Sequence, residues 1–135
     1  MKLLRILFLL PAALLLMGMG DLGGAPQGAV PETGEDIRAV IVDRQGVRTE
    51  VDRFSMGGKT YLEGARGSGR MMVEFHKLAG IEFKEGLGDE VPVILNLRTG
   101  EKQELLVNKR AAFYGTTDFG TFMIRARDVR HIAFP

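Results

Sequence analysis

The sequence predicts an all-β domain made of two tandem copies of one antiparallel unit of about fifty residues, each with four or five strands. Short runs of branched aliphatic residues alternate with glycine-containing turns from Ile37 onwards, which is typical of strands. The stretch 64–83 also matches 115–134 without a gap, and five of the twenty positions are identical. Because the repeat has a fixed spacing, we expect one domain over 37–135 with repeats at 37–84 and 91–135.

Each copy is expected to begin with a strand, a glycine turn and a returning strand. Branched aliphatic residues favour the first strand, and Gly46 or Gly100 favours the turn. The expected segments are 37–43, 44–46 and 47–54 in the first copy, and 91–97, 98–100 and 101–107 in the second.

Three further strands complete each copy. They are expected at 59–63, 70–75 and 80–83 in the first copy, and at 111–114, 121–126 and 131–134 in the second. The shared glycines are expected to frame the turn before the fourth strand, and the shared Met72 and Met123 are assigned to folding. Strand side chains alternate between faces, so one set in the fourth strands should face the core. This set is Met71, Val73 and Phe75 with Phe122, Ile124 and Ala126.

About ten short strands are too many for a flat exposed sheet in a chain of this length. A β-sandwich or a pair of small barrels would close such a sheet, and the sequence leaves both open. The succession of strand, glycine turn, strand and a final Ile-x-Phe strand, as in Ile81 to Phe83 and Ile132 to Phe134, resembles SH3-like and Sm-like small barrels. That resemblance concerns the order of elements and implies no functional residues.

The first twenty residues have the pattern of a secretory signal peptide. Lys2 and Arg5 form a basic start, an apolar run follows from Ile6 to Met17, and the small residue Gly20 marks the expected cleavage site. An uncleaved membrane anchor is the alternative. Residues 21–36 are rich in Gly and Pro and are expected to be a flexible spacer. The chain should therefore be exported, and be periplasmic or secreted after cleavage.

The composition excludes several classes of function. The chain has no cysteine, which removes disulfides, thiolate metal sites and thiol nucleophiles. It has 18 basic and 17 acidic residues, and two of the basic ones lie in the expected signal peptide. A nearly neutral domain has no global field to attract nucleic acid, so no nucleic-acid partner is expected.

No residue has the context of a catalytic, cofactor-binding or metal-ligating group. The glycine-rich loop at 64–70 lacks the following helix that a phosphate-binding loop requires. His76 and His131 occupy different positions in the two copies, and no ligand spacing links them to a carboxylate. Ser55 and Ser68 lie outside any nucleophile elbow. We therefore predict a protein that is not an enzyme.

Residues that differ between the copies are the candidates for contact with a partner. Phe119 is an aromatic side chain at a hairpin tip where the first copy has Ser68, and Arg125 belongs to a locally basic segment. The full set is Tyr114, Phe119, Arg125, Arg127 and Arg130.

The sequence thus predicts a binding or assembly module of the cell envelope, contacting an envelope protein or a second copy of itself through β-sheet edges. The membrane would be contacted only by an uncleaved N-terminal segment. The alternative is a small ligand-binding or carrier protein with a cavity between the repeats.

Overall fold

The computed structural model describes residues 35–135, so the expected signal peptide and nearly all of the expected spacer lie outside the described residues. Within this range the fold is all-β, as predicted, with ten antiparallel strands and two single-turn 3-10 helices. None of its helices is long and apolar enough to cross a membrane. The strands are β1 (Ala39–Asp43), β2 (Arg48–Met56), β3 (Tyr61–Arg66), β4 (Gly69–Glu74), β5 (Leu78–Phe83), β6 (Glu90–Leu97), β7 (Lys102–Asn108), β8 (Ala112–Thr117), β9 (Gly120–Arg125) and β10 (Val129–Ala133). The 3-10 turns are η1 (Phe75–Lys77) and η2 (Ala126–Asp128).

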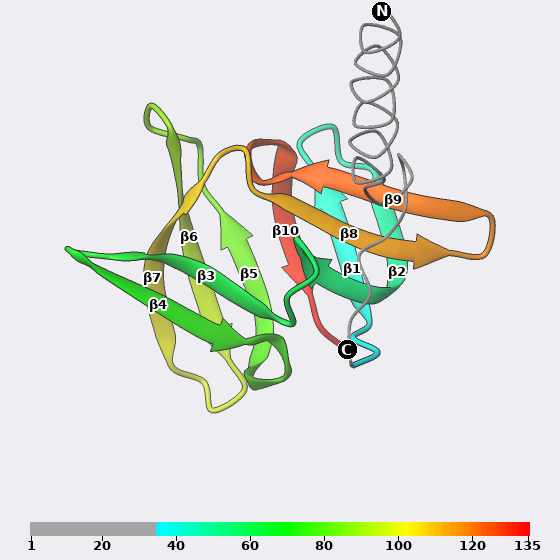
Figure 1. The fold of residues 1–135 in the computed structure, drawn as a ribbon, viewed down its shortest axis with the longest axis horizontal. Helices are drawn as coiled ribbons and strands as arrows, with labels where there is room; N and C mark the ends of the chain where they lie inside the picture. Colours follow the sequence, from blue (N-terminus) through cyan, green and yellow to red (C-terminus); the bar gives the residue numbers. More distant parts are fainter. Residues whose placement is uncertain (1–34) are drawn as a thin grey trace, which may run out of the picture.

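All ten strands follow one order of hydrogen-bonded neighbours, β4-β3-β7-β6-β5-β10-β1-β2-β8-β9. The sheet curls into a half-barrel with two lobes that meet at the β5–β10 pair (Figure 1). The first lobe holds β5-β6-β7-β3-β4 and the second holds β10-β1-β2-β8-β9. One curled sheet thus closes on its own core, where the sequence suggested either a sandwich or two barrels.

The first hairpin of each sequence half pairs with strands of the other half. The β1–β2 hairpin pairs with β8 and β10, and the β6–β7 hairpin pairs with β3 and β5. Each lobe is therefore built from strands of both sequence halves, which joins the halves by backbone hydrogen bonds as well as by side-chain packing.

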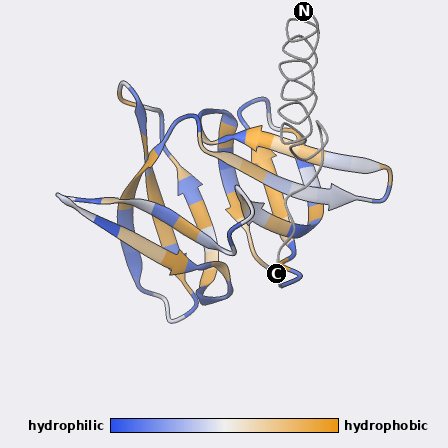
Figure 2. Cartoon of the chain, in the orientation of Figure 1, coloured by the Kyte–Doolittle hydropathy of each residue, from blue (hydrophilic) through white to orange (hydrophobic). Residues whose placement is uncertain are grey.

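Phenylalanine rings fill the core where the lobes meet. Phe54 lies between three other rings, with centroid distances of 4.9 Å to Phe75, 5.6 Å to Phe113 and 5.6 Å to Phe134. Phe83 completes the cluster through an edge contact to Phe113 at 5.8 Å. Hydrophobic and hydrophilic residues alternate along the strands, as period-two burial requires (Figure 2). Burying each ring contributes about 1.5–3 kcal/mol to the stability of the fold, compared with leaving the ring exposed.

The predicted core set faces the core: Phe75, Ile124 and Ala126 are buried, and Met71, Val73 and Phe122 are partly buried against it. Phe75 and Ala126 lie in the 3-10 turns and not in the fourth strands. Two other expectations are wrong. Gly64 and Gly115 lie inside β3 and β8, whereas the turns fall at 67–68 and 118–119. These glycines allow close approach of a neighbouring strand: a Cβ at Gly115 would lie 2.5 Å from Val51 Cβ, and one at Gly64 would lie 2.9 Å from the Leu106 carbonyl oxygen. Met72 and Met123 are 57% and 47% exposed, so core packing does not explain their identity.

Candidate binding site at the β8–β9 hairpin

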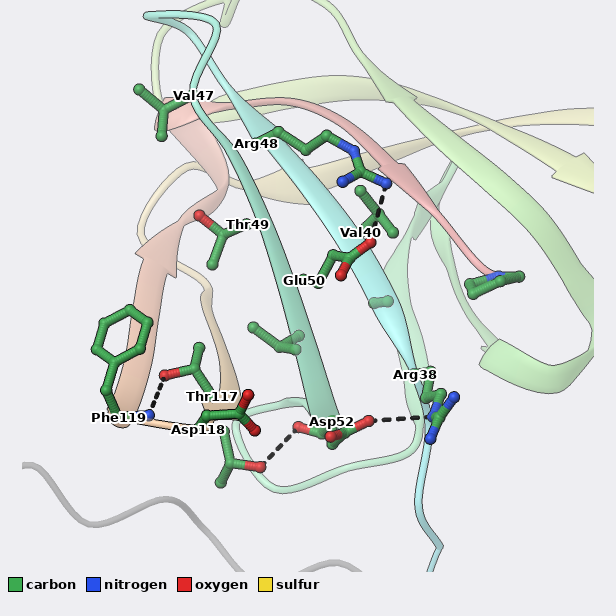
Figure 3. Close-up of a pocket in the computed structure, with 14 residues that line it drawn as sticks. Arg38, Val40, Val47, Arg48, Thr49, Glu50, Asp52, Thr117, Asp118 and Phe119 are labelled. Carbon is green, nitrogen blue, oxygen red and sulfur yellow. Dashed lines mark hydrogen bonds and ion pairs between the residues drawn. The ribbon is translucent and has the colours of Figure 1, made fainter.

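An open groove of about 780 Å³ lies where β1 and β2 meet the tip of the β8–β9 hairpin. Strands that are distant in the sequence form it, because β2 pairs with β8 in the second lobe. Figure 3 shows its lining residues, with Phe119 at one end and Arg38 at the other. Its lining residues are Arg38, Ala39, Val40, Val47, Arg48, Thr49, Glu50, Val51, Asp52, Thr116, Thr117, Asp118, Phe119 and Pro135.

Asp52 anchors the polar part of the groove. Its carboxylate forms an ion pair with Arg38, with Nε 3.2 Å from Oδ1, and its carbonyl oxygen accepts from Thr116 Oγ1 at 3.3 Å. The register of β2 against β8 shifts just after Asp52, where Arg53 adopts a φ of 51°. The Asp36 carboxylate accepts from the Arg53 amide at 2.9 Å and so supports this bulge, which turns the strand at the groove floor.

Phe119 is 94% exposed, which is the highest value among the exposed large hydrophobic residues of 35–135. Its turn is closed by the Thr117 hydroxyl, which donates to the Gly120 carbonyl at 2.9 Å and accepts from the Phe119 amide at 3.4 Å. The backbone at the tip is therefore held by side-chain bonds, while the ring itself lies in solvent.

The other predicted contact residues lie apart from the groove. Tyr114 and Arg125 share the outer face of the β8–β9 hairpin, since Tyr114 is opposite Met123 and Arg125 is opposite Ala112. Arg125 donates to the Arg110 carbonyl at 2.8 Å. Phe119 is thus the one predicted contact residue that lines the groove.

Arg127 and Arg130 belong to neither surface. Arg127 is in η2 and lies 3.8 Å from the Asp128 carboxylate. Arg130 is in β10 and donates to the Arg44 carbonyl at 3.1 Å. The basic segment seen in the sequence is therefore divided among β9, η2 and β10.

No sequence signal pointed to the groove residues in and next to the first two strands, chiefly Arg38, Val47, Thr49 and Asp52. Arg38 and Val47 directly precede β1 and β2, and Thr49 and Asp52 follow the ordinary alternation of a surface strand. They become part of a site only because β2 lies beside β8, and no local pattern predicts that pairing.

One histidine and one serine, His76 and Ser55, have local partners. His76 Nε2 lies 3.2 Å from the Glu74 carboxylate on the surface, and Ser55 is buried with its hydroxyl oxygen accepting from the Gly58 amide at 3.1 Å. Within residues 35–135, no group of three or more His, Asp or Glu side chains could hold a metal ion.

The outer face of the β3–β4 hairpin has its own charge cluster. Glu63 accepts from Arg70 at 2.8 Å and from Lys59 at 3.3 Å. The hydrogen bond from Arg70, followed by the bond from Lys59 and its positive charge, lowers the pKa of Glu63. A second open groove, of about 410 Å³, lies beside this hairpin at Tyr61, Met72, Val73, Glu74 and Lys77.

Comparison with known proteins places the chain among relatives without an assigned activity. It is 27% identical over 130 residues to an uncharacterized protein of Aquifex aeolicus (strain VF5), and the match covers 96% of this chain and 95% of the relative. No solved structure matches it. A family model described as "Uncharacterised protein" matches residues 33–135. The chain belongs to this family of uncharacterised proteins.

Proposed function

We propose that this chain is an exported, non-enzymatic binding module of the cell envelope that contacts a partner protein through the β8–β9 hairpin tip. The observation that carries the proposal is the 94% exposure of Phe119 at the rim of the groove. Aromatic anchors surrounded by polar residues often dominate the energy of protein interfaces. Burying this ring against a partner would contribute about 1.5–3 kcal/mol.

The groove favours a partner that is apolar at one point and polar around it. Phe119 and the 54% exposed Val47 offer apolar surface at the hairpin end, while Arg38 and Asp52 offer a charge of each sign further along. A partner segment with an apolar side chain flanked by polar groups would match this arrangement. The groove is open and carries side chains of both charge signs. Such a surface suits contact with a protein better than binding of a small apolar ligand.

Export is supported by the N-terminal segment. Lys2 and Arg5 precede the apolar run 6–17, and small residues follow it up to Gly20. The match to the Aquifex relative spans 96% of the chain, so it takes in most of this segment as well as the β domain. Cell fractionation and N-terminal sequencing would test export, with Asp21 expected as the first residue of the mature protein.

We also propose that the domain arose by tandem duplication. Arg44 donates to the Phe83 carbonyl at 3.0 Å, and Arg98, its equivalent in the second half, donates to the Phe134 carbonyl at 3.4 Å. The backbone amides of the same arginines donate to Asp128 and Lys77, which are again equivalent positions. The strand order supports the duplication too. If each strand is replaced by its equivalent in the other half, β1 by β6 and so on to β5 by β10, the order read from one end becomes the same order read from the other end.

The carrier alternative has less support. It needs a cavity between the repeats, and the junction of the lobes is instead occupied by the rings of Phe54, Phe75, Phe113 and Phe134. The groove of about 780 Å³ is lined by residues of both repeats but is open, and the groove of about 410 Å³ lies along β3 and β4 at one end of the sheet.

Site-specific photocrosslinking in the native host tests the binding role. A photoreactive phenylalanine at position 119 of the full chain should give a discrete higher-mass adduct, detected with an antibody because a tag at Pro135 would sit in the groove. The same residue at Leu87, a 76% exposed side chain in the β5–β6 loop, is the matched control. Equal adducts at both positions, or none at 119, would rule out the hairpin tip as the contact.

A further inference from the structure

Strand β4 ends the sheet at the side opposite the groove. Its six residues pair with β3 without a bulge, from Tyr61 opposite Glu74 to Arg66 opposite Gly69. Within residues 35–135, β3 is the one strand hydrogen-bonded to β4. The strand contains no proline or lysine, which are two common protections of a sheet edge. It therefore presents a straight edge to which another strand can be added.

The hairpin geometry decides which backbone groups point outward. The two-residue turn at 67–68 closes at Arg66 and Gly69, so these two residues form a hydrogen-bonded pair. Hydrogen-bonded and non-hydrogen-bonded pairs alternate along an antiparallel ladder. The amides and carbonyls of Arg70, Met72 and Glu74 consequently face the open edge.

The side chains of these three residues share the outer face of the hairpin. Met72 is 57% exposed, and the side chains of Arg70 and Glu74 are 60% and 55% exposed. The open groove of about 410 Å³ follows this edge and includes both Met72 and Glu74 in its lining. Along β4, the apolar Met72 thus lies between the cation of Arg70 on one side and the anion of Glu74 on the other.

We propose that the chain forms a closed dimer in which β4 of a second copy adds antiparallel to β4, about a two-fold axis at Met72. In this register each Met72 faces the other, and each Arg70 faces the Glu74 of the second copy. Directly opposite residues of an antiparallel pair lie on the same face, so the methionines and both charge pairs come together on the outer face. The edge is therefore complementary to itself in hydrogen bonding, shape and charge.

The opposite end of the sheet is less suited to this pairing. The equivalent residues of β9 are Thr121, Met123 and Arg125, which contain one sign of charge. Pairing β4 with β9 of a second copy, with Met72 opposite Met123, would place Arg70 opposite Arg125. Like charges directly opposite each other destabilise a pair of strands. The charges thus favour a closed dimer through β4 over an open chain of molecules.

This inference goes beyond the binding role proposed above and uses the other end of the sheet. Phe119 lies at the β8–β9 tip, so a Phe119→Ser variant should dimerise as the natural chain does. Loss of the partner contact at Phe119 and loss of the dimer are consequently separate results.

Disulfide crosslinking tests the dimer, because the chain has no cysteine of its own. The full chain carrying Met72→Cys, purified in a mild detergent and oxidised, should migrate as a dimer without reductant. Opposed residues in a hydrogen-bonded pair are about 5.5 Å apart at Cα, which a disulfide can span. Met123→Cys is the matched control, since Met123 lies on the equivalent strand and is 47% exposed against 57% for Met72, and it should remain monomeric.

Charge exchange distinguishes specific pairing from collision. Added to Met72→Cys, either Arg70→Glu or Glu74→Arg places like charges opposite each other and should lower the rate of crosslinking about tenfold. The variant with both changes restores opposite charges across the axis and should recover most of the rate. Circular dichroism of each variant verifies that the fold is retained. Equal crosslinking of Met72→Cys and Met123→Cys, or no recovery in the double exchange, would overturn the proposal.

Discussion

The two sequence halves, 39–83 and 90–134, contain the same succession of four strands, a 3-10 turn and a fifth strand, but their exposed side chains differ. Gly64 and Gly115 allow the same close approach of strands, and Arg44 and Arg98 bond to the ends of equivalent strands. On the outer faces the halves diverge. The β3–β4 hairpin has Glu63, Arg70 and Glu74, where the β8–β9 hairpin has Tyr114, Thr121 and Arg125.

This difference separates what folding needs from what a surface is free to change. Buried and closely packed positions are kept in both halves because both lobes require the same pairing of strands. The exposed positions carry no such requirement, and one end of the sheet is charged while the other has an aromatic tip. Changing equivalent residues in both halves therefore tests the comparison directly.

The largest effect on the free energy of unfolding is expected at Gly115 and Gly64, where neighbouring strands approach closely. Gly115→Ala should lower the free energy of unfolding by about 3 kcal/mol, because its Cβ would overlap a Cβ that cannot swing away. Gly64→Ala meets a carbonyl oxygen at 2.9 Å and a side-chain carbon at 3.2 Å, and should cost about 1–2 kcal/mol. Urea unfolding measures both changes.

Gly120→Ala is the control for these variants, since nothing lies within 4 Å of its Cβ position. Its effect should stay within about 0.5 kcal/mol of the natural chain. If Gly115→Ala unfolds at the same urea concentration as Gly120→Ala, close approach is not the reason for the shared glycine.

A smaller effect is expected at the equivalent arginines. Arg44 donates to the Lys84 and Phe83 carbonyls at 2.7 and 3.0 Å, whereas Arg98 bonds to His76 and Phe134 at 2.9 and 3.4 Å. Arg44→Ala should cost about 1–1.5 kcal/mol and Arg98→Ala about 0.5–1 kcal/mol. Thermal unfolding of the two variants tests this order, and a reversed order would show that bond length does not set their contribution.

The acid response should distinguish the two hairpins. The pKa of Glu63 is lowered in the fold, so its contribution to stability is present above the pKa of an unfolded glutamate, about 4.3, and is lost as the pH falls through the lower folded value. Arg70→Ala should raise the pKa of Glu63 and weaken the loss of stability in acid. Carbon-detected NMR titration of the carboxylate measures this, and Arg125→Ala should leave it unchanged.

The smallest effect on stability is expected at the aromatic tip. Phe119→Ser gives the second hairpin the residue found at the tip of the first, and the ring makes no buried contact. The free energy of unfolding, measured by thermal unfolding, should change by no more than about 0.5 kcal/mol. A large loss would mean that Phe119 supports the fold, and its exposure would no longer argue for a partner.

The sequence by itself determined the strand class, the turns at Gly46 and Gly100 and the core face of the fourth strands, because period-two alternation and turn residues are local signals. It also pointed to Phe119, through the contrast with Ser68. Only the tertiary structure decided that β1–β2 joins β8–β9, that Arg38 and Asp52 share a groove with Phe119, and that Met72 is exposed at an open edge. These features depend on which strands become neighbours, and that choice is made by packing between residues far apart in the chain.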